Sequence, residues 1–264
     1  MSLLDGTVLI TGATGGIGQA ITRAFAERGA SLILTGRRAE VLEPLANEVG
    51  GRAIACDLSR RDDVDRLLGD VGAPDVLVAN AALPATGELT DLAQEEIDRM
   101  LEVNLRAPIA LARGLGPAMI SRRSGHMVFI ASLAGKAASP ASSIYSATKF
   151  GLRGFALGIR EDLRHHGVGV SVVLPGFIRN AGMFAESGVQ LPRGVGTKTP
   201  EDVAEAVVRA VERNRGEVEV APLGLRLGAG LAGVAPGLAA TVKRRVGGDK
   251  IASGLAEGQR AKRV

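Results

Sequence analysis

A tyrosine and a lysine stand four residues apart in a segment with helical character. Tyr145 is the only tyrosine of the 264-residue chain, and its spacing from Lys149 places both side chains on one face of a helix. A free phenol titrates near pH 10, so acid–base work near neutrality needs a pKa drop of about three units, or about 4 kcal/mol. An ammonium group at about 4 Å supplies energy of that order. We therefore expect Tyr145 to act as the acid or base of a reaction, with Lys149 as its electrostatic partner.

Ser132 adds a hydroxyl group to this pair. It lies thirteen residues before Tyr145, directly after an apolar run that we expect to be a strand. A hydroxyl there would bind a substrate oxygen, hold it within reach of Tyr145 and stabilise developing charge. The three side chains together suit proton transfer at oxygen, as in the interconversion of an alcohol and a carbonyl compound.

A glycine-rich turn near the start of the chain predicts dinucleotide binding. The residues Thr11-Gly12-Ala13-Thr14-Gly15-Gly16-Ile17-Gly18 join an expected strand to an expected helix. Gly12 permits a tight turn, Gly16 lets the backbone approach a pyrophosphate, and Gly18 lets the helix pack closely on the strand. The start of the helix offers N–H groups and a positive dipole to phosphate. No Gly-Lys-Ser/Thr sequence follows, which excludes a nucleoside-triphosphate P-loop.

The end of the second expected strand indicates which dinucleotide binds. NAD-binding folds place an acidic residue there, on the ribose 2′-hydroxyl, and this chain has Gly36-Arg37-Arg38 instead. Gly36 leaves space, and Arg37 and Arg38 offer bidentate donors to a 2′-phosphate. This pattern favours NADP(H); the alternative interpretation is that both arginines are simply solvated at a helix start.

Short apolar runs alternate with helical segments, the pattern of a parallel sheet covered by helices on both faces. The expected strands are 8–11, 31–35, 52–55, 75–79, 126–131, 169–174 and 217–220. The expected helices are 17–27, 39–49, 62–68, 94–120, 143–165 and 201–214. Right-handed crossovers then give an α/β, doubly wound Rossmann sheet of seven strands in the order 3-2-1-4-5-6-7. Ligands of such folds bind at the carboxyl ends of the strands, near the point where the strand order reverses.

These motifs resemble those of the short-chain dehydrogenase/reductase family. The segment Thr11 to Gly18 is similar to that family's TGxxxGxG, Tyr145 to Lys149 to its YxxxK, and Ser132 to its catalytic serine. The likeness covers about residues 5–222. It implies an NAD(P)-dependent oxidoreductase, and it implies Asn104 as a fourth catalytic residue that relays protons through water to Lys149.

The resemblance also implies cofactor contacts farther along the chain. Asp57, in Cys56-Asp57-Leu58, corresponds to the acid that contacts adenine, although a role as a turn residue before Ser59 explains it equally well. Asn80 matches the second Asn of the family's NNAG, whose first Asn and Gly are both Ala here. The segment Pro175-Gly176-Phe177-Ile178-Arg179-Asn180 is similar to PGxxxT, which holds the nicotinamide carboxamide, with Asn in place of Thr. An Asn side chain still donates and accepts, so we expect cofactor binding with an altered loop geometry.

The stretch 181–198 resembles the family's substrate lid in position. Met183, Phe184, Val189 and Leu191 make it apolar, which favours an apolar substrate. A lid that packs on its own core would need the same residues.

The composition excludes several classes of protein. Aromatic residues make up 3% of the chain, too few for a nucleic-acid surface built on stacked rings. The single cysteine, Cys56, excludes an internal disulfide and a cysteine-clustered metal site; with three histidines, we expect no metal. The first residues lack the pattern of a secretory signal, so we expect a cytoplasmic protein. We expect His126 to be exposed at the start of its strand, and Cys56 to be buried in one.

The C-terminal part differs from the rest. We divide the chain into a dinucleotide-binding catalytic domain, 1–222, and a basic, Gly/Ala-rich extension, 223–264. The stretch 223–242 carries one charge, Arg226, and Lys243-Arg244-Arg245 follow it. Five glycines and Pro236 argue against a membrane-spanning helix, which leaves a peripheral membrane contact or a cover over the cleft or a neighbouring subunit.

The sequence thus predicts an NADP(H)-dependent oxidoreductase that interconverts an alcohol and a ketone or aldehyde on an apolar substrate. Its partners are a small molecule and, from the family resemblance, one or three further copies of the chain, but no nucleic acid. The rival hypothesis is a non-catalytic NADP(H)-binding sensor or regulator on the same fold.

Overall fold

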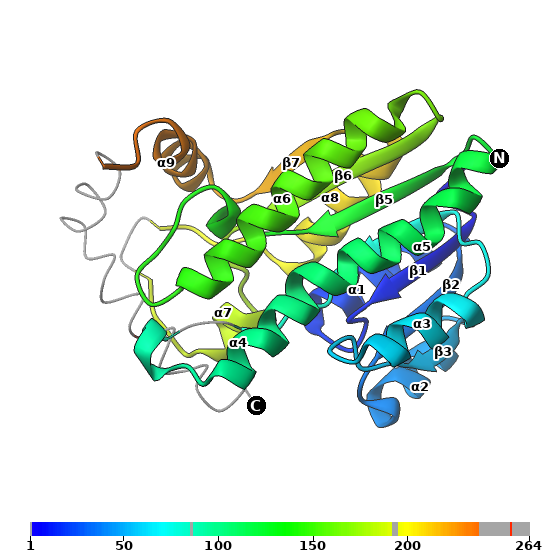
Figure 1. Cartoon of the computed structure of the whole chain (residues 1–264), viewed down its shortest axis with the longest axis horizontal. Coiled ribbons are helices and arrows are strands. Elements are labelled where there is room, and N and C mark those ends of the chain that lie inside the picture. The colour runs from blue at the N-terminus through cyan, green and yellow to red at the C-terminus, as the bar shows by residue number, and fades with distance from the viewer. Residues whose placement is uncertain (1, 85–86, 192–194, 238–253, 255–264) are drawn as a thin grey trace.

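A parallel sheet forms the centre of the molecule (Figure 1). The computed structural model describes residues 2–84, 87–191, 195–237 and 254. The seven strands lie in the order β3-β2-β1-β4-β5-β6-β7, which confirms the predicted topology. They are β1 (Thr7–Thr11), β2 (Ser31–Gly36), β3 (Arg52–Ala55), β4 (Val76–Ala79), β5 (Gly125–Ile130), β6 (Val168–Pro175) and β7 (Glu217–Val220). The order reverses between β1 and β4, so the crevice of a doubly wound fold opens beyond their carboxyl ends.

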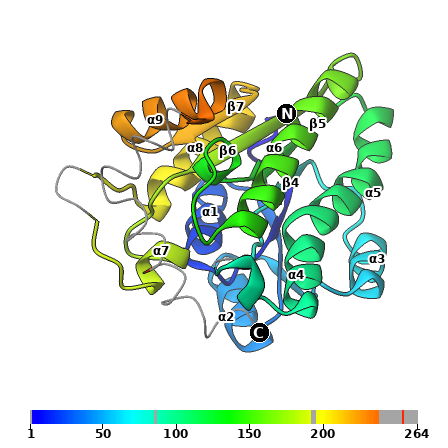
Figure 2. The ribbon, with the colours of Figure 1, turned by 60° about the vertical axis from the view of Figure 1, so that its left-hand side comes forward.

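Helices cover both faces of this sheet, as Figures 1 and 2 show. The helices are α1 (Gly16–Ala26), α2 (Ala39–Glu48), α3 (Arg61–Asp70), α4 (Gln94–Leu101), α5 (Ala107–Ser121), α6 (Ser143–Arg164), α7 (Gly182–Glu186), α8 (Pro200–Glu212) and α9 (Leu223–Val234). Short turns of helix are η1 (Leu89–Asp91), η2 (Glu102–Arg106) and η3 (Leu133–Gly135). One face of the sheet packs against α1, α2 and α8, and the other against α3, α4, α5 and α6.

The strands are buried on both faces because their alternate residues enter different cores. In β1, Leu9 packs in the core beneath α5 and α6, whereas Val8 and Ile10 pack beneath α1 and α8. This is why the strands read as continuous apolar runs rather than as alternating ones. The sheet is therefore a rigid platform that fixes the loops at its carboxyl edge.

The expected helix 94–120 is interrupted in the structure. It consists of α4, one π-helical turn (η2) and α5 in direct succession. A π-turn inserts one extra residue into a helix and is found frequently at functional sites. Hydrophobic periodicity does not reveal such an insertion, because the flanking helices keep their apolar faces.

The prediction that His126 is exposed is wrong. The side chain is buried in β5, and its Nε2 lies 2.7 Å from the hydroxyl oxygen of Ser171 in β6. That hydroxyl donates to the carbonyl oxygen of Arg215 at 2.6 Å, so Nε2 carries the proton and donates to Ser171. Burial, with a smaller contribution from the Arg160 charge, lowers the pKa of His126 to about 3. His126 is therefore a neutral core residue at the amino end of β5, the end opposite the carboxyl edge of the sheet.

The C-terminal extension is described only in part. Its start forms α9, which the sequence analysis did not predict, and α7 in the lid was not predicted either. The basic cluster 243–245 lies outside the described residues. The division into a domain 1–222 and an extension 223–264 stays a prediction.

Candidate active site

Three predicted side chains meet at the carboxyl ends of β5 and β6. Ser132 follows β5 and caps η3, where its hydroxyl oxygen accepts a hydrogen bond from the Ala134 N–H at 3.1 Å. Tyr145 lies in the first turn of α6, close enough to Ser132 for that hydroxyl to lower the pKa of the phenol. The Nζ atom of Lys149, one helical turn later, lies 5.6 Å from the centre of the Tyr145 ring. The fold therefore brings Ser132, Tyr145 and Lys149 into one cluster.

Lys149 is a buried cation with a fixed position. Its side chain is among the largest fully buried ones, and Nζ donates to the carbonyl oxygen of Ile130 at 3.0 Å. Burial lowers the pKa of Lys149 to about 8, so the ammonium form still dominates at neutral pH. A charged group that stays buried beside a phenol is suited to stabilising the tyrosinate.

The balance of effects on Tyr145 differs from the expected one. Burial raises the pKa of its phenol, and the nearby Ser132 hydroxyl lowers it by a smaller amount. We expected Lys149 to lower the pKa of the Tyr145 phenol nearly to 7, and this expectation is wrong for the protein without a bound cofactor. Tyr145 keeps its proton, and the group is set up as a proton donor.

Asn104 lies in the π-turn η2 and is fully buried. Its side-chain oxygen accepts from the Leu83 N–H at 2.7 Å, and its amide donates to the Leu83 carbonyl at 2.9 Å. This side chain thus fixes the loop after β4 beneath the crevice. The proton relay from Asn104 to Lys149 that the family resemblance implies stays a prediction.

The glycine turn between β1 and α1 has the shape that a pyrophosphate requires. Gly12 has φ +64°, and a Cβ atom there would lie 2.7 Å from the Cα of Ala81. Asn80 donates from its amide to the carbonyl oxygens of Thr11 and Gly12 at 3.0 and 3.1 Å. The Thr11 hydroxyl accepts the N–H groups of Asn80 and Ala81, both at 3.1 Å. Asn80 therefore holds this turn even though its neighbours depart from the family's NNAG.

The start of α1 has no side-chain cap. The helix begins at Gly16 after an N-cap glycine, so no side chain caps it, and its first turn contains no acidic residue. Free N–H groups and the positive end of the helix dipole therefore face the loop unopposed. A Cβ atom on Gly18 would lie 2.8 Å from the Cα of Ala13, so glycine is required for this packing.

The outer end of the crevice carries positive charge. Arg37 and Arg38 are exposed after β2, and Arg38 donates to the Thr14 carbonyl at 3.4 Å, which holds it over the glycine turn. Burial raises the pKa of Asp57, but hydrogen bonds from Ser59 and the charges of Arg37 and Arg99 outweigh that effect and leave the pKa lowered.

Asp57 and its neighbours form a turn at this end of the crevice. Asp57 accepts from both the N–H and the hydroxyl of Ser59, at 3.0 and 2.8 Å, which is the turn role considered above. Leu58 is buried in the core, so only its backbone faces the crevice. Cys56 is buried as expected, one residue beyond β3 rather than within it.

The loop after β6 explains one departure from the family pattern. Pro175 ends β6, and Gly176 lies so close to Ala221 that a Cβ atom would meet that side chain at 2.9 Å. Ile178 packs in the core, which leaves its backbone as the part available to a cofactor. Asn180 has φ +70°, a conformation that Asn tolerates and β-branched Thr does not. Whether this loop differs in geometry from loops that carry Thr at this position stays a prediction.

The lid lies against the glycine turn. A Cβ atom on Gly16 would collide with the side chain of Ala181, the residue before α7. Phe177 and Phe184 pack together with ring centres 5.0 Å apart. The contact between Ala181 and Gly16 was not predicted, because nothing in the sequence relates the start of a variable lid to a turn 165 residues earlier. Residues 192–194 of the predicted lid lie outside the described residues.

Ion pairs fix the loop after η3 and helix α6 to β7. Lys136, which follows η3, contacts Glu217 at 2.5 Å and Glu219 at 2.7 Å. Arg153, one turn after Lys149 on α6, contacts Glu217 at 2.6 Å. These partly buried pairs hold both the loop after Ser132 and helix α6 in place. The one local signal for this cluster is weak: Glu and Val alternate along the short segment Glu217-Val218-Glu219-Val220.

Two negative findings apply to the described ranges. Within them, no group of three or more His, Cys, Asp or Glu side chains is placed to hold a metal ion. No helix among them is long and apolar enough to cross a bilayer.

The chain is similar in sequence to known proteins. A family model described as short chain dehydrogenase matches residues 6–191, which include the glycine turn, Ser132, Tyr145 and Lys149. The chain belongs to the short-chain dehydrogenase/reductase family. Among similar members is a ketoacyl reductase, HetN, of Nostoc sp., which is 38% identical over 83% of this chain and 80% of its own length. A dehydrogenase/reductase SDR family member 7B of Bos taurus is 34% identical over 89% of this chain and 79% of its own.

Solved structures of the family superpose on this short-chain dehydrogenase/reductase. A metagenomic short-chain oxidoreductase in complex with NADP has a TM-score of 0.70 and 36% identity, and covers 84% of this chain and 99% of its own. A short-chain dehydrogenase from Sphingobium yanoikuyae in complex with NADPH has a TM-score of 0.76 and 29% identity, over 89% and 94% of the two chains.

Proposed function

We propose that this short-chain dehydrogenase/reductase is an NADP(H)-dependent enzyme that interconverts an alcohol and a ketone or aldehyde on an apolar substrate. The observation that carries the proposal is the Tyr145 phenol, near the Ser132 hydroxyl and beside the buried ammonium of Lys149, at the same edge of the sheet as the uncapped start of α1. The ketoacyl reductase among its relatives and the NADP complexes among similar structures support it.

The residues along the crevice fit a dinucleotide with a 2′-phosphate. The N–H groups at Gly16, Ile17 and Gly18 would hold the pyrophosphate, since α1 starts without a side-chain cap. Arg37 and Arg38 would hold the 2′-phosphate, since β2 ends without a carboxylate.

Other parts of the crevice complete the proposed cofactor site. The remaining contacts come from Thr11, Gly12, Asp57, Leu58, Asn80, Tyr145, Lys149, Pro175, Gly176, Ile178 and Asn180. When bound, NADP(H) supplies or accepts the hydride.

The chain's own residues handle the proton. In the reducing direction, the Ser132 hydroxyl donates a hydrogen bond to the carbonyl oxygen of the substrate and orients it. Tyr145 gives its proton to that oxygen as the carbon gains a hydride, which forms the alcohol. The Lys149 ammonium stabilises the tyrosinate that remains. To restore Tyr145, Lys149 passes one of its protons to the tyrosinate, and Lys149 then regains a proton from water at Asn104.

The lid favours an apolar substrate. Its apolar side chains lie at the end of β6 and in α7. The ring of Phe177, just after β6, packs on the ring of Phe184 in α7, and Met183 is the residue before Phe184. Burying such surface stabilises a ligand by about 25 cal/mol for each Å². A panel of ketones of increasing chain length should therefore show kcat/KM rising with length.

The experiment that tests this function combines cofactor binding with turnover. NADPH and NADH are titrated against the protein by cofactor fluorescence, and a panel of ketones and alcohols is then assayed with each cofactor. We expect NADPH to bind at least tenfold more tightly, about 1.4 kcal/mol, and to support turnover. Arg37→Ala with Arg38→Ala should remove that preference without weakening NADH binding. Tighter binding of NADH by the parent protein contradicts the role of the two arginines.

The rival function is a non-catalytic NADP(H) sensor on the same fold. A sensor needs the glycine turn and the two arginines, but it has no use for a proton-donating Tyr145 beside a buried Lys149. Tight NADPH binding without turnover of any compound in the panel would favour the sensor.

We also propose a homodimer or homotetramer in the cytoplasm. Leu101 on α4 and Phe150 on α6 are large exposed apolar side chains near the catalytic helices, and pairing of copies would cover them. Light scattering during size exclusion measures the number of copies; a monomer at micromolar concentration contradicts this assembly.

A further inference from the structure

Helix α9 exposes a continuous apolar strip. Leu223, Leu227, Leu231 and Val234 have exposed fractions of 65%, 66%, 42% and 88%. Their spacings of four, four and three residues place all four on one face of the helix. We call these four residues the α9 strip. Isolated exposed leucines are normal on a protein surface, but a row of four along one helix indicates a contact site.

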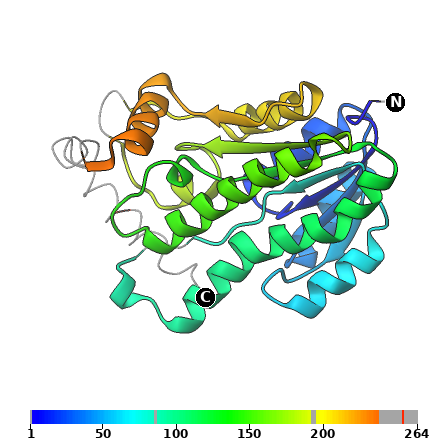
Figure 3. The ribbon, with the colours of Figure 1, turned by 45° about the horizontal axis from the view of Figure 1, so that its top comes forward.

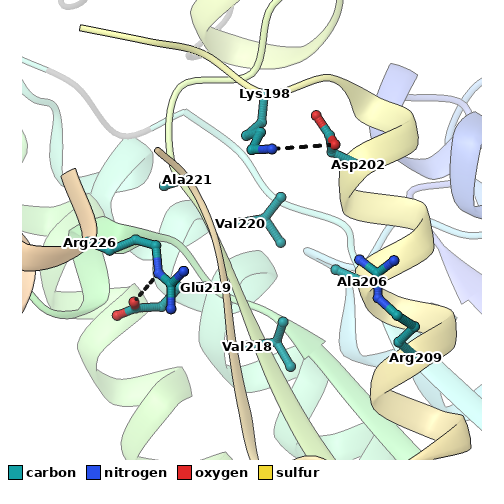
Figure 4. A pocket seen from close by; sticks show the side chains of 9 residues that line it. All are labelled: Lys198, Asp202, Ala206, Arg209, Val218, Glu219, Val220, Ala221 and Arg226. Carbon is teal, nitrogen blue, oxygen red and sulfur yellow. Dashed lines mark hydrogen bonds and ion pairs between the residues drawn. The ribbon is translucent and has the colours of Figure 1, made fainter. Parts of the chain in front are cut away.

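The opposite face of α9 holds the helix to the body of the protein. Ala229 is buried there, and Leu225 and Ala232, on the same side, are partly buried. Arg226, the only charged residue of α9, pairs with Glu219 of β7 at 3.0 Å (Figure 4). Glu219 in turn contacts Lys136 at 2.7 Å. The strip therefore faces outward because the helix is anchored from behind.

The position of α9 relates the strip to the active site. Helix α9 begins three residues after β7 ends, so it lies at the carboxyl edge of the sheet. In Figure 3 this orange helix lies at the end of the sheet toward which the strand arrows point. Ser132 and Tyr145 lie at that edge as well. A surface that contacts the α9 strip would thus lie beside the crevice.

The charge of the chain identifies what the strip contacts. Residues 1–220 carry a net charge of −2, whereas residues 221–264 carry +6, nearly all of it after α9 in the sequence. An apolar helix face that a basic stretch follows in the sequence matches the surface of a bilayer with anionic lipids, where each Lys or Arg near the surface contributes favourably.

We propose that the α9 strip docks this protein on the surface of an anionic membrane. The twelve residues of α9 span about 18 Å, too short to cross a hydrocarbon core of about 30 Å, so the helix lies in the plane of the interface. The four apolar side chains enter the lipid, and the body of the protein stays in water. Docking brings the crevice to the lipid surface, where apolar carbonyl compounds collect; this last consequence rests on the proposed oxidoreductase function, whereas membrane binding does not.

The test measures binding of the full-length chain to sedimenting vesicles. One set of vesicles contains phosphatidylcholine alone, and the other contains phosphatidylcholine with phosphatidylglycerol. We expect binding to the anionic vesicles to exceed binding to the neutral ones at least tenfold and to decrease at high salt. Leu227→Gln with Leu231→Gln should reduce binding at least tenfold. Leu89→Gln, which changes an equally exposed leucine in η1, should leave binding within about twofold of the parent.

Four results would overturn the proposal. The first is that neither vesicle binds, and the second is that the α9 double variant binds as well as the parent. The third is that the double variant changes the number of copies by light scattering, because the strip is then an interface between copies. The fourth is that the double variant lowers the melting temperature by several degrees, because the strip is then covered by the chain's own later residues. None of these readouts uses turnover, so a failure of the proposed enzymatic activity is distinguishable from them.

Discussion

The buried histidine of β5 makes the stability of this fold sensitive to mild acid. His126 has a folded-state pKa of about 3, against about 6.5 for the unfolded chain. Because the folded pKa is the lower one, the unfolded chain binds the extra proton. The stability that neutral His126 contributes to the fold is therefore present above pH 6.5 and is lost as the pH falls from 6.5 towards 3. Between pH 7 and pH 5 the free energy of unfolding should fall by about 2 kcal/mol from this residue alone.

Denaturant unfolding followed by far-UV circular dichroism measures this loss, since the chain has no tryptophan to report by fluorescence. In His126→Gln the loss between pH 7 and pH 5 should shrink to under about 0.5 kcal/mol, whatever the stability at pH 7. Carboxylates titrate mostly below this window. His166→Gln, at an exposed position, should keep the loss of the parent. An equal loss in His126→Gln and in the parent would refute the assignment.

Three further predictions concern the site. Lys136→Met removes the cation shared by Glu217 and Glu219, which keep only Arg153 and Arg226, and should lower the free energy of unfolding by about 1 kcal/mol in thermal melts; no loss contradicts the role of the cluster. Asn180→Thr should lower it by about 1 kcal/mol and Asn180→Gly should not, because only Thr is strained at φ +70°. The kcat/KM for ketone reduction should fall above about pH 8 as Lys149 loses its proton; a profile flat to pH 10 contradicts that assignment.

The fold was largely predictable because its signals are local. Seven apolar runs separated by helical segments define the parallel sheet, and the right-handed rule fixes its order. The spacing of Tyr145 and Lys149 needs only the helical period, and Ser132 needs only the end of a strand. These three side chains are brought together in the structure.

The features that sequence reasoning missed depend on contacts between distant segments. The burial of His126 comes from Ser171, 45 residues later, which supplies the hydrogen bond that makes a neutral imidazole tolerable in the core. The side chain of Asn104, in the π-turn, bonds to the Leu83 backbone, 21 residues earlier, and Ala181 contacts Gly16, 165 residues earlier.

The pKa of Tyr145 was misjudged for the same reason. The interaction with Lys149 is visible in the spacing, but the opposing effect of burial depends on everything packed around the phenol. The strip on α9 was hidden because its residues read as an ordinary apolar stretch until the helix showed which face is covered.

The most direct test of the central claim is the turnover of Tyr145→Phe. The parent and the variant are titrated with NADPH by fluorescence, and NADPH oxidation is then followed with the best ketone of the panel. Removing the hydroxyl removes the proton donor, so kcat should fall at least about a hundredfold while the Kd for NADPH stays within about twofold. A variant that keeps most of its turnover would contradict Tyr145 as the acid.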